Sequence, residues 1–294
     1  MNPLSTPFTD DPITLHGPQQ AAQPIVLDSP HSGTRFPADF GAAVSHEALR
    51  DGEDCFIDAL WQPAAARGIP LLAAEYPRTY LDPNRHAGDI DLDLLADRHW
   101  PDAHVPSGKA TIGKALIWRT LDDGTPIYDR PLTVDEIRGR IARCHAPYHQ
   151  RLAALMAAAH AAHGVVVHIN CHSMNAVAGA MGEGPAGTPR ADIVLGDRDG
   201  TTCAPALTAL VREQLAARGY RVAINDPFKG VELVRAFGQP VAGRHSLQLE
   251  VNKRLYMDEA TRSRHDGFAR LQADLMALLD AVAQAARAGR FQAA

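Results

Sequence analysis

The sequence predicts one α/β domain with a mostly parallel central sheet flanked by helices. Three observations favour this fold class: short apolar runs alternate with helical patterns, several runs are apolar throughout, and no repeat or low-complexity linker divides the 294 residues. Strands covered by helices on both faces have this continuous apolar character. A hydrophobic content of 46% is sufficient for a full core.

Six strands are expected, and an irregular segment precedes them. Residues 1–23 are rich in Pro and Gln and lack periodicity, so we interpret them as a tail or surface strap. Residues 24–290 are predicted to form the single domain. The expected strands are 25–28, 71–76, 165–170, 192–195, 221–225 and 246–251.

Helical patterns separate the strands. One of them begins with Thr133 as N-cap and Glu136 at the third helical position. Pro147 interrupts this pattern, which is therefore either two helices or one kinked helix. The expected helices are 54–67, 133–163, 205–218 and 259–287.

Residues 86–131 show no strand–helix alternation and are predicted to be an insertion. Within them, Asp122, Asp123 and Gly124 lie between two partly apolar runs and are typical of a hairpin turn. Long insertions in α/β enzymes form part of a site wall or a lid, or they run over the surface. The sequence favours neither alternative.

Charge and composition exclude several classes of protein. The 29 basic and 34 acidic residues give a net charge of −5, which argues against a nucleic-acid-binding protein or a polybasic membrane protein. No apolar run approaches the roughly 18 residues of a membrane span. The start of the chain lacks a signal-peptide pattern, and the four cysteines form no C-x-x-C pair, so we expect a reduced cytoplasmic protein.

Two glycine-rich segments resemble nucleotide-binding motifs but lack their context. Residues 182–187 fit G-x-G-x-x-G, yet no convincing strand precedes them and Pro185 disfavours a helix start. Residues 108–115 resemble a P-loop that ends in Ala115 instead of the Ser or Thr that binds Mg²⁺. The sequence also contains no G-x-S-x-G or H-E-x-x-H motif.

Histidines follow two of the predicted strands, where ligands bind in open α/β sheets. The first predicted strand leads into His31 and the third into His172, and each histidine is followed by Ser. One such histidine is more often structural, but two at matching positions favour a site. Asp51, Glu53 and Asp54 lie at the start of a predicted helix, where one can cap the helix or complete a metal site.

Two histidines and one carboxylate with an open fourth position are the pattern of a hydrolytic zinc site. Glu250 lies among apolar residues of the last predicted strand, where a charge is costly unless it is partnered. It is either half of a buried salt bridge or a general base with a tuned pKa.

Basic side chains also gather after predicted strands. Arg78, Asn84 and Arg85 follow the second strand, and Lys229 and Arg235 follow the fifth. Arginine binds carboxylates through a bidentate fork, so these residues would suit a small acidic substrate. The alternative is ordinary surface charge.

Together these segments resemble the N-formylglutamate amidohydrolase family, in order and spacing, from about residue 25 to 285. The family is similar to zinc carboxypeptidases and aspartoacylases, which implies an α/β fold around a mixed sheet. The matching segments are PHSGTRFP (30–37), Asp54 with its helix, AAEYPRTYLDPNR (73–85), PYH (147–149), NCHSM (170–174), FKG (228–230) with Arg235 and Gly238, and QLEVNKRLYMDE (248–259).

The resemblance implies one divalent metal ion, Zn²⁺ by preference, with His31 and His172 as ligands. Carboxypeptidase-like sites often place the acidic ligand three residues after the first histidine, but Thr34 occupies that position here. Aligning the chain on its AAEY segment puts Asp54, and not Glu53, at the acidic position of the family.

The resemblance also implies roles for the remaining candidates. Glu250 matches a general base, and Arg78 matches an arginine that stabilises the oxyanion. Four further residues match or suit the binding of two substrate carboxylates: Asn84 with Arg85, and Lys229 with Arg235.

The implied reaction is hydrolysis of N-formyl-L-glutamate to formate and L-glutamate, the last step of one route of histidine degradation. Two alternatives remain open: another N-acyl amino acid deacylase or carboxypeptidase-like hydrolase on the same scaffold, and a non-catalytic protein that binds acidic metabolites.

Overall fold

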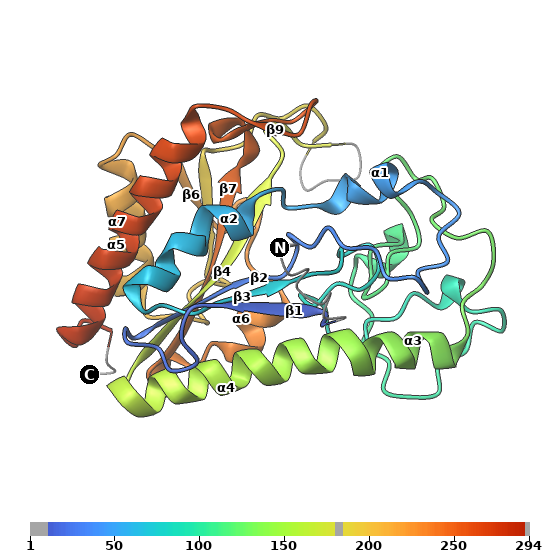
Figure 1. The fold of residues 1–294 in the computed structure, drawn as a ribbon, viewed down its shortest axis with the longest axis horizontal. Coiled ribbons are helices and arrows are strands. Elements are labelled where there is room, and N and C mark those ends of the chain that lie inside the picture. Colours follow the sequence, from blue (N-terminus) through green and yellow to red (C-terminus); the bar gives the residue numbers. More distant parts are fainter. Residues whose placement is uncertain (1–10, 180–184, 292–294) are drawn as a thin grey trace, which may run out of the picture.

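A seven-stranded mixed sheet runs through the molecule in the order β1-β3-β2-β4-β7-β5-β6 (Figure 1). The computed structural model describes residues 11–179 and 185–291. Four of the six strand pairs are parallel, and β1–β3 and β5–β7 are antiparallel, which confirms the predicted fold class. The strands are β1 (Ile13–His16), β2 (Ile25–Ser29), β3 (Leu71–Ala74), β4 (Val166–Met174), β5 (Ile193–Gly196), β6 (Val222–Ile224) and β7 (Arg244–Asn252).

Each of the six predicted strands is present with shifted ends, and β1 is an additional strand. β1 pairs with β3 at the edge of the sheet, within the segment that we interpreted as a tail or strap. Four residues are too few to establish a period, so the pairing with β3, and not the local pattern, makes this segment a strand. Residues 1–10 of the interpreted tail lie outside the described residues, as do Gly182 and Gly184 of the G-x-G-x-x-G match.

Helices cover both faces of the sheet (Figure 1). On one face, α2 (Ile57–Trp61), α5 (Pro205–Ala216) and α7 (Gly267–Arg287) enclose the larger hydrophobic core. On the other face, α4 (Ala146–His163) and α6 (Glu232–Phe237) contribute to a second core. Two further helices, α1 (His46–Leu49) and α3 (Val134–Arg140), lie beside the sheet.

The predicted helix 133–163 is divided by a π-helical turn, Ile141–His145, between α3 and α4. Thr133 and Glu136 form the expected capping box. Pro147 lies in the first turn of α4, directly after the π-helical turn, so the break precedes it.

The predicted helix 259–287 begins later than expected, at Gly267. The preceding residues form a small hairpin of β8 (Met257–Asp258) and β9 (Ser263–Arg264). Helix α6 was not predicted, because six residues with only two buried apolar side chains give no helical period.

The insertion at 86–131 contributes Leu94, Trp100, Ile117 and Ile127 to a third hydrophobic cluster, which it shares with segments on either side, such as Phe40 and Ile137. The predicted turn is present, since Leu121 N donates to Thr125 O at 2.9 Å, but only an isolated bridge accompanies it instead of two strands. All four cysteines are buried and free. No helix in the described ranges combines the length and apolar character that crossing a membrane requires.

Candidate metal and active site

Along the middle of the β4–β7 pair, one face carries a polar side chain at every second position. The residues between them, such as Ile169 and Leu249, belong to the larger core on the opposite face. This alternation is visible in the sequence, although the runs suggested strands that are apolar on both faces. The parallel register places His168 beside Ser246, Asn170 beside Gln248, and His172 beside Glu250.

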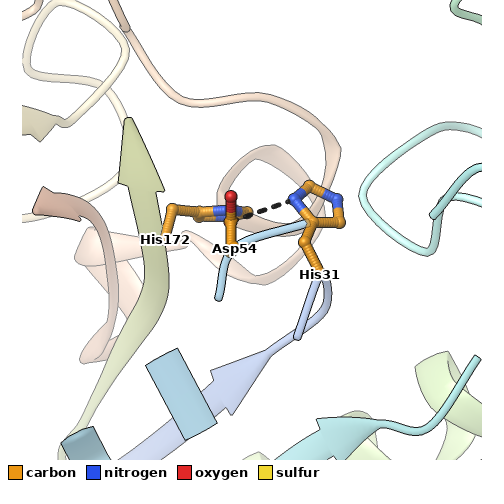
Figure 2. A group of neighbouring side chains, drawn as sticks. All are labelled: His31, Asp54 and His172. Atoms are coloured by element: carbon orange, nitrogen blue, oxygen red, sulfur yellow. Dashed lines mark hydrogen bonds and ion pairs between the residues drawn. The ribbon is translucent and has the colours of Figure 1, made fainter. Parts of the chain in front are cut away.

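Three buried side chains from separate elements converge at the end of this polar face (Figure 2). His31 comes from the loop after β2, Asp54 from the segment before α2, and His172 from β4. Asp54 Oδ2 lies 3.4 Å from His31 Nδ1 and 3.0 Å from His172 Nδ1. Ligands bonded at 2.0–2.2 Å around one tetrahedral ion are about 3.4 Å apart, so the spacing fits a divalent metal.

The backbone brings these segments together. The amide of Asp54 donates to the carbonyl of His31 at 3.0 Å. The His31 loop also packs against the end of β3, where a Cβ on Gly33 would lie 2.3 Å from the carbonyl oxygen of Tyr76. Glu53 points elsewhere and pairs with Arg50, so the structure brings Asp54, and not Glu53, to the histidines.

Asp82 orients the first histidine. Its Oδ1 lies 2.7 Å from His31 Nε2, and an ionised carboxylate can only accept, so the ring proton is on Nε2. His31 Nδ1 is buried, forms no hydrogen bond among the described residues, and faces Asp54. Burial opposes the charge on Asp82, but Arg78 and His31 hold its pKa well below the ordinary value. A histidine with one ring nitrogen held by a carboxylate and the other directed at a second acidic group has the arrangement typical of a metal ligand.

The protonation states of the other two candidate ligands also fit a cation. Burial opposes the charge on Asp54, but the neighbouring His172 and His31 rings lower its pKa, so the carboxylate is ionised. Burial and the neighbouring His31 lower the pKa of His172, which keeps the ring neutral. Metal binding needs an ionised carboxylate and neutral imidazoles.

Glu250 lines the same cavity and is 7% exposed. Gln248 Nε2 donates to Glu250 Oε1 at 2.9 Å. Burial and the charge of Asp54 raise the pKa of Glu250 well above the ordinary value, although the neighbouring Arg78 opposes this shift. A carboxyl group with a raised pKa beside a metal site is suited to take up and return a proton.

The cavity has a volume of about 540 Å³ and a surplus of positive charge, although the chain as a whole is negative. Among the described residues, seven basic and four acidic side chains line it, and the predicted Arg78, Asn84, Arg85 and Lys229 are among the lining residues. The other basic residues of the lining were not predicted as site residues: Lys109, Lys114, Arg190 and Lys253.

The structure does not bring Arg235 to this cavity. Its side chain is half-exposed and pairs with Glu232, because α6 buries Leu233 and Val234 instead. Asn84 reaches the cavity, but its Oδ1 accepts from the amide of Leu233 at 2.9 Å. Lys229 is exposed and pairs with Asp199 at 3.0 Å.

The insertion forms a wall of the cavity. Its Trp118 is covered by two cations, with Lys114 Nζ 3.8 Å and the guanidinium carbon of Arg78 5.1 Å from the ring centroid. Lys114 also pairs with Asp122. Of the two alternatives that the sequence left open, the structure supports the site wall.

Two histidines hold the loop that carries Asn84 and Arg85. His145 Nε2 lies 2.9 Å from the carbonyl of Arg85, and His149 Nε2 lies 2.8 Å from that of Pro83. Their rings stack at 4.0 Å, next to the π-helical turn. The π-helical turn and α4 therefore hold the loop that forms this side of the cavity.

We expect acidification to destabilise the protein through His145. Burial lowers the pKa of His145 to about 4 from an ordinary 6.5. Between these values the unfolded chain binds a proton that the folded chain does not, so stability falls as the pH falls. The loss from pH 7 to pH 5 amounts to about 2 kcal/mol.

Denaturant unfolding at pH 7 and pH 5 measures this loss. The variant His145→Gln keeps an N–H donor for the Arg85 carbonyl and should lose about 2 kcal/mol less than the wild type over this interval. His99→Gln, on the exposed surface, is the matched control. An equal pH dependence in the wild type and His145→Gln would contradict the assignment.

Comparisons with known proteins agree on one family. The family model of the N-formylglutamate amidohydrolases matches residues 23–257. The chain is 33% identical over 242 residues to the N-formylglutamate deformylase of Pseudomonas aeruginosa, covering 80% of this chain and 83% of that protein. It is 28% identical over 263 residues to that of Pseudomonas putida, covering 85% and 86%.

Solved structures give the same result. The crystal structure of N-formylglutamate amidohydrolase from Ralstonia eutropha JMP134 is 48% identical, with a TM-score of 0.88 over 95% of this chain and 99% of that chain. A gene product of Agrobacterium tumefaciens shares the fold, with a TM-score of 0.65 at 17% identity over 92% of this chain and 96% of that chain.

Proposed function

The chain belongs to the N-formylglutamate amidohydrolase family, and from this premise we propose that it hydrolyses N-formyl-L-glutamate to formate and L-glutamate. The observation that carries the proposal is the convergence of His31, Asp54 and His172 beside Glu250 in a cationic cavity. The metal dependence of the reaction and the role of each residue are part of the proposal.

We propose that His31, Asp54 and His172 hold one divalent metal ion, with Zn²⁺ as the first choice. When bound, such an ion supplies Lewis acidity for a carbonyl group and lowers the pKa of water. The spacing of the three donors, the ionised Asp54 and the neutral His172 support this assignment.

Glu250 moves the proton in the proposed reaction. It takes a proton from the attacking water as the oxygen bonds to the formyl carbon, and it delivers that proton to the glutamate nitrogen as the C–N bond breaks. Its raised pKa lets it act first as base and then as acid. The products are formate and the free amine.

Arg78 stabilises the negative charge that develops on the formyl oxygen. Its Nε and Nη2 donate to Asp82, which fixes the guanidinium in the cavity wall and leaves Nη1 for the substrate. Asp82 thus orients both His31 and Arg78.

The positive lining supports a substrate with two carboxylates. Arg85 is 8% exposed and lies 3.7 Å from Asp82, so it is held at the cavity with little freedom. We propose that Arg85 binds one carboxylate and that Lys229 and Arg190 serve the other. For Arg235, and for Asn84 as a carboxylate ligand, the contacts within the protein give less support.

Formate release from N-formyl-L-glutamate tests the proposed function. N-Acetyl-L-glutamate, N-formyl-L-leucine and a short peptide, each followed by release of its free amino group, separate this reaction from deacylation in general, from recognition of one carboxylate, and from carboxypeptidase activity. A higher kcat/KM for any of these would overturn the proposed substrate. Binding of the acidic compounds without turnover by the zinc-loaded protein would favour a binding protein.

Arg85→Ala is expected to raise KM roughly 10- to 100-fold, with a smaller change in kcat, because a carboxylate contact is present before and during the reaction. Steady-state formate release measures both constants. Arg67→Ala, which removes a surface arginine paired with Asp280, is the matched control. A large fall in kcat with an unchanged KM would instead assign Arg85 to the transition state.

A further inference from the structure

A buried chain of hydrogen bonds leads from β7 to the second candidate metal ligand. His168 Nδ1 lies 2.7 Å from Ser246 Oγ, and His168 Nε2 lies 2.7 Å from Asp28 Oδ1. Asn170 Nδ2 donates to the same Asp28 oxygen at 2.8 Å, and His172 Nε2 lies 2.7 Å from Asn170 Oδ1. Asp28, His168, Asn170 and Ser246 are all fully buried, at 0% exposure.

The charge in this chain lies on Asp28. Burial opposes that charge, but His168, Tyr148 and Asn170 together lower the pKa of Asp28 below its ordinary value. The Tyr148 hydroxyl, from α4, donates to Asp28 Oδ2 at 2.7 Å. Both carboxylate oxygens therefore accept hydrogen bonds, and Asp28 has no proton to donate.

This charge fixes the amide of Asn170. The two residues are direct neighbours in the register of β2 and β4, so the amide meets the carboxylate at short range. A flipped amide would turn its oxygen toward Asp28 and its NH₂ group toward Asn84 Nδ2, which donates to Asn170 Oδ1 at 3.5 Å. Repulsion on both sides excludes the flip.

The fixed amide in turn selects one form of the His172 ring. Because Asn170 Oδ1 can only accept, it favours the His172 tautomer with the proton on Nε2, which is the form that a metal ion on Nδ1 requires. The lone pair on Nδ1 then faces Asp54 Oδ2, 3.0 Å away. His31 reaches the same form through direct contact with the Asp82 carboxylate, whereas His172 is separated from its carboxylate by an amide.

We propose that Asn170 and Asp28 are positioning residues that hold His172 in its metal-binding tautomer and thereby set the affinity of the site for a divalent cation. This inference rests on the proposed function only in taking His172 as a metal ligand. Neither residue belongs to the three-residue metal cluster, so both act through the histidine.

Zinc affinity of the full-length, metal-stripped protein tests the proposal, measured by competition with a chromophoric chelator at one pH. Asn170→Ala and Asp28→Ala are each expected to weaken Zn²⁺ binding about 10- to 100-fold. The effect of Asp28→Ala is the more telling, because Asp28 touches neither His172 nor the metal site.

A charge swap provides the rescue. The double variant Asp28→Asn/Asn170→Asp keeps one carboxylate in the chain and places it directly on His172 Nε2. It is expected to bind Zn²⁺ within about 3-fold of the wild type, or more tightly. This variant conserves volume and hydrogen bonds, so it stays informative if the alanine variants fail to fold.

Asn252→Ala is the matched control for loss of a buried asparagine. Asn252 lies on the neighbouring β7 at 0% exposure, with hydrogen bonds to Ala191 and Arg254. It should lower thermal stability and leave zinc affinity unchanged. Wild-type affinity in folded Asn170→Ala or Asp28→Ala, or a swap variant that binds no better than Asn170→Ala, would overturn the proposal.

The affinity measurement involves no substrate. Wild-type protein that binds Zn²⁺ tightly but releases no formate would overturn the proposed reaction and leave the positioning role of Asn170 and Asp28 intact. Formate release by the wild type, combined with unchanged Zn²⁺ affinity in the variants, would overturn the positioning role and leave the proposed reaction intact.

Discussion

Replacing Glu250 with glutamine is expected to lower kcat roughly 10²- to 10⁴-fold while the protein keeps its metal. Glutamine has nearly the same shape and can still meet the Gln248 side chain, but it cannot accept a proton from water. Glu250 is not among the three candidate metal ligands, so metal content should stay the same. Formate release and elemental analysis of the same sample measure the two quantities.

Glu213→Gln is the control for this substitution, because it replaces the same carboxylate by the same amide at an exposed position of α5. It should leave kcat and KM unaltered. A near-normal rate in Glu250→Gln would remove Glu250 as the proton carrier. A loss of metal in that variant would reassign Glu250 to the metal site.

Removal of Asp54 is expected to abolish both the metal and the activity. Asp54 faces both histidines, and Asp54→Ala leaves two neutral nitrogens that bind a divalent ion weakly. We expect metal content to fall from about one ion per chain to near zero, and kcat to fall at least about 10³-fold. Elemental analysis and formate release measure the two effects.

The adjacent carboxylate supplies a close control. Glu53 is also buried, but its partner is Arg50, so Glu53→Ala should lower stability and retain the metal. Equal metal loss in the two variants would show that the acidic ligand has been misassigned. Full activity in metal-free wild type would contradict the metal-dependent reaction itself.

The sheet was predictable from sequence because its central strands carry apolar residues either in short continuous runs or at every second position. Strands β4 and β7, of nine residues each, exceed their predicted lengths because pairing extends the ladder beyond the apolar run. β1 and α6 were not predictable, since each is short and is stabilised by contacts with distant segments. Helix α7 begins later than predicted because the residues before it form the β8–β9 hairpin.

The residues of the site also fall into those that the sequence could indicate and those that it could not. His31 and His172 stand out in the sequence because each follows a strand, and the structure brings them together with Asp54. Asn170 and Gln248 could have been found from the alternation of polar and apolar residues along their strands.

Other lining residues had no such signal. Lys114 and Trp118 reach the cavity through an insertion whose path depends on a hydrophobic cluster shared with distant segments, and no local pattern encodes that path. Arg235 is the opposite case. It belongs to a matching segment of the sequence, but in this structure it pairs with Glu232 and is not among the residues that line the cavity.

The positive cavity has a consequence for the turnover of the proposed substrate. N-Formylglutamate carries two negative charges and a neutral amide nitrogen, which suits a lining in which the described basic side chains outnumber the acidic ones. Cleavage turns that nitrogen into an ammonium group and sends one negative charge away with formate. Glutamate therefore leaves a site that attracts it less than its precursor, and product inhibition should be weak even though the carbon skeleton is unchanged.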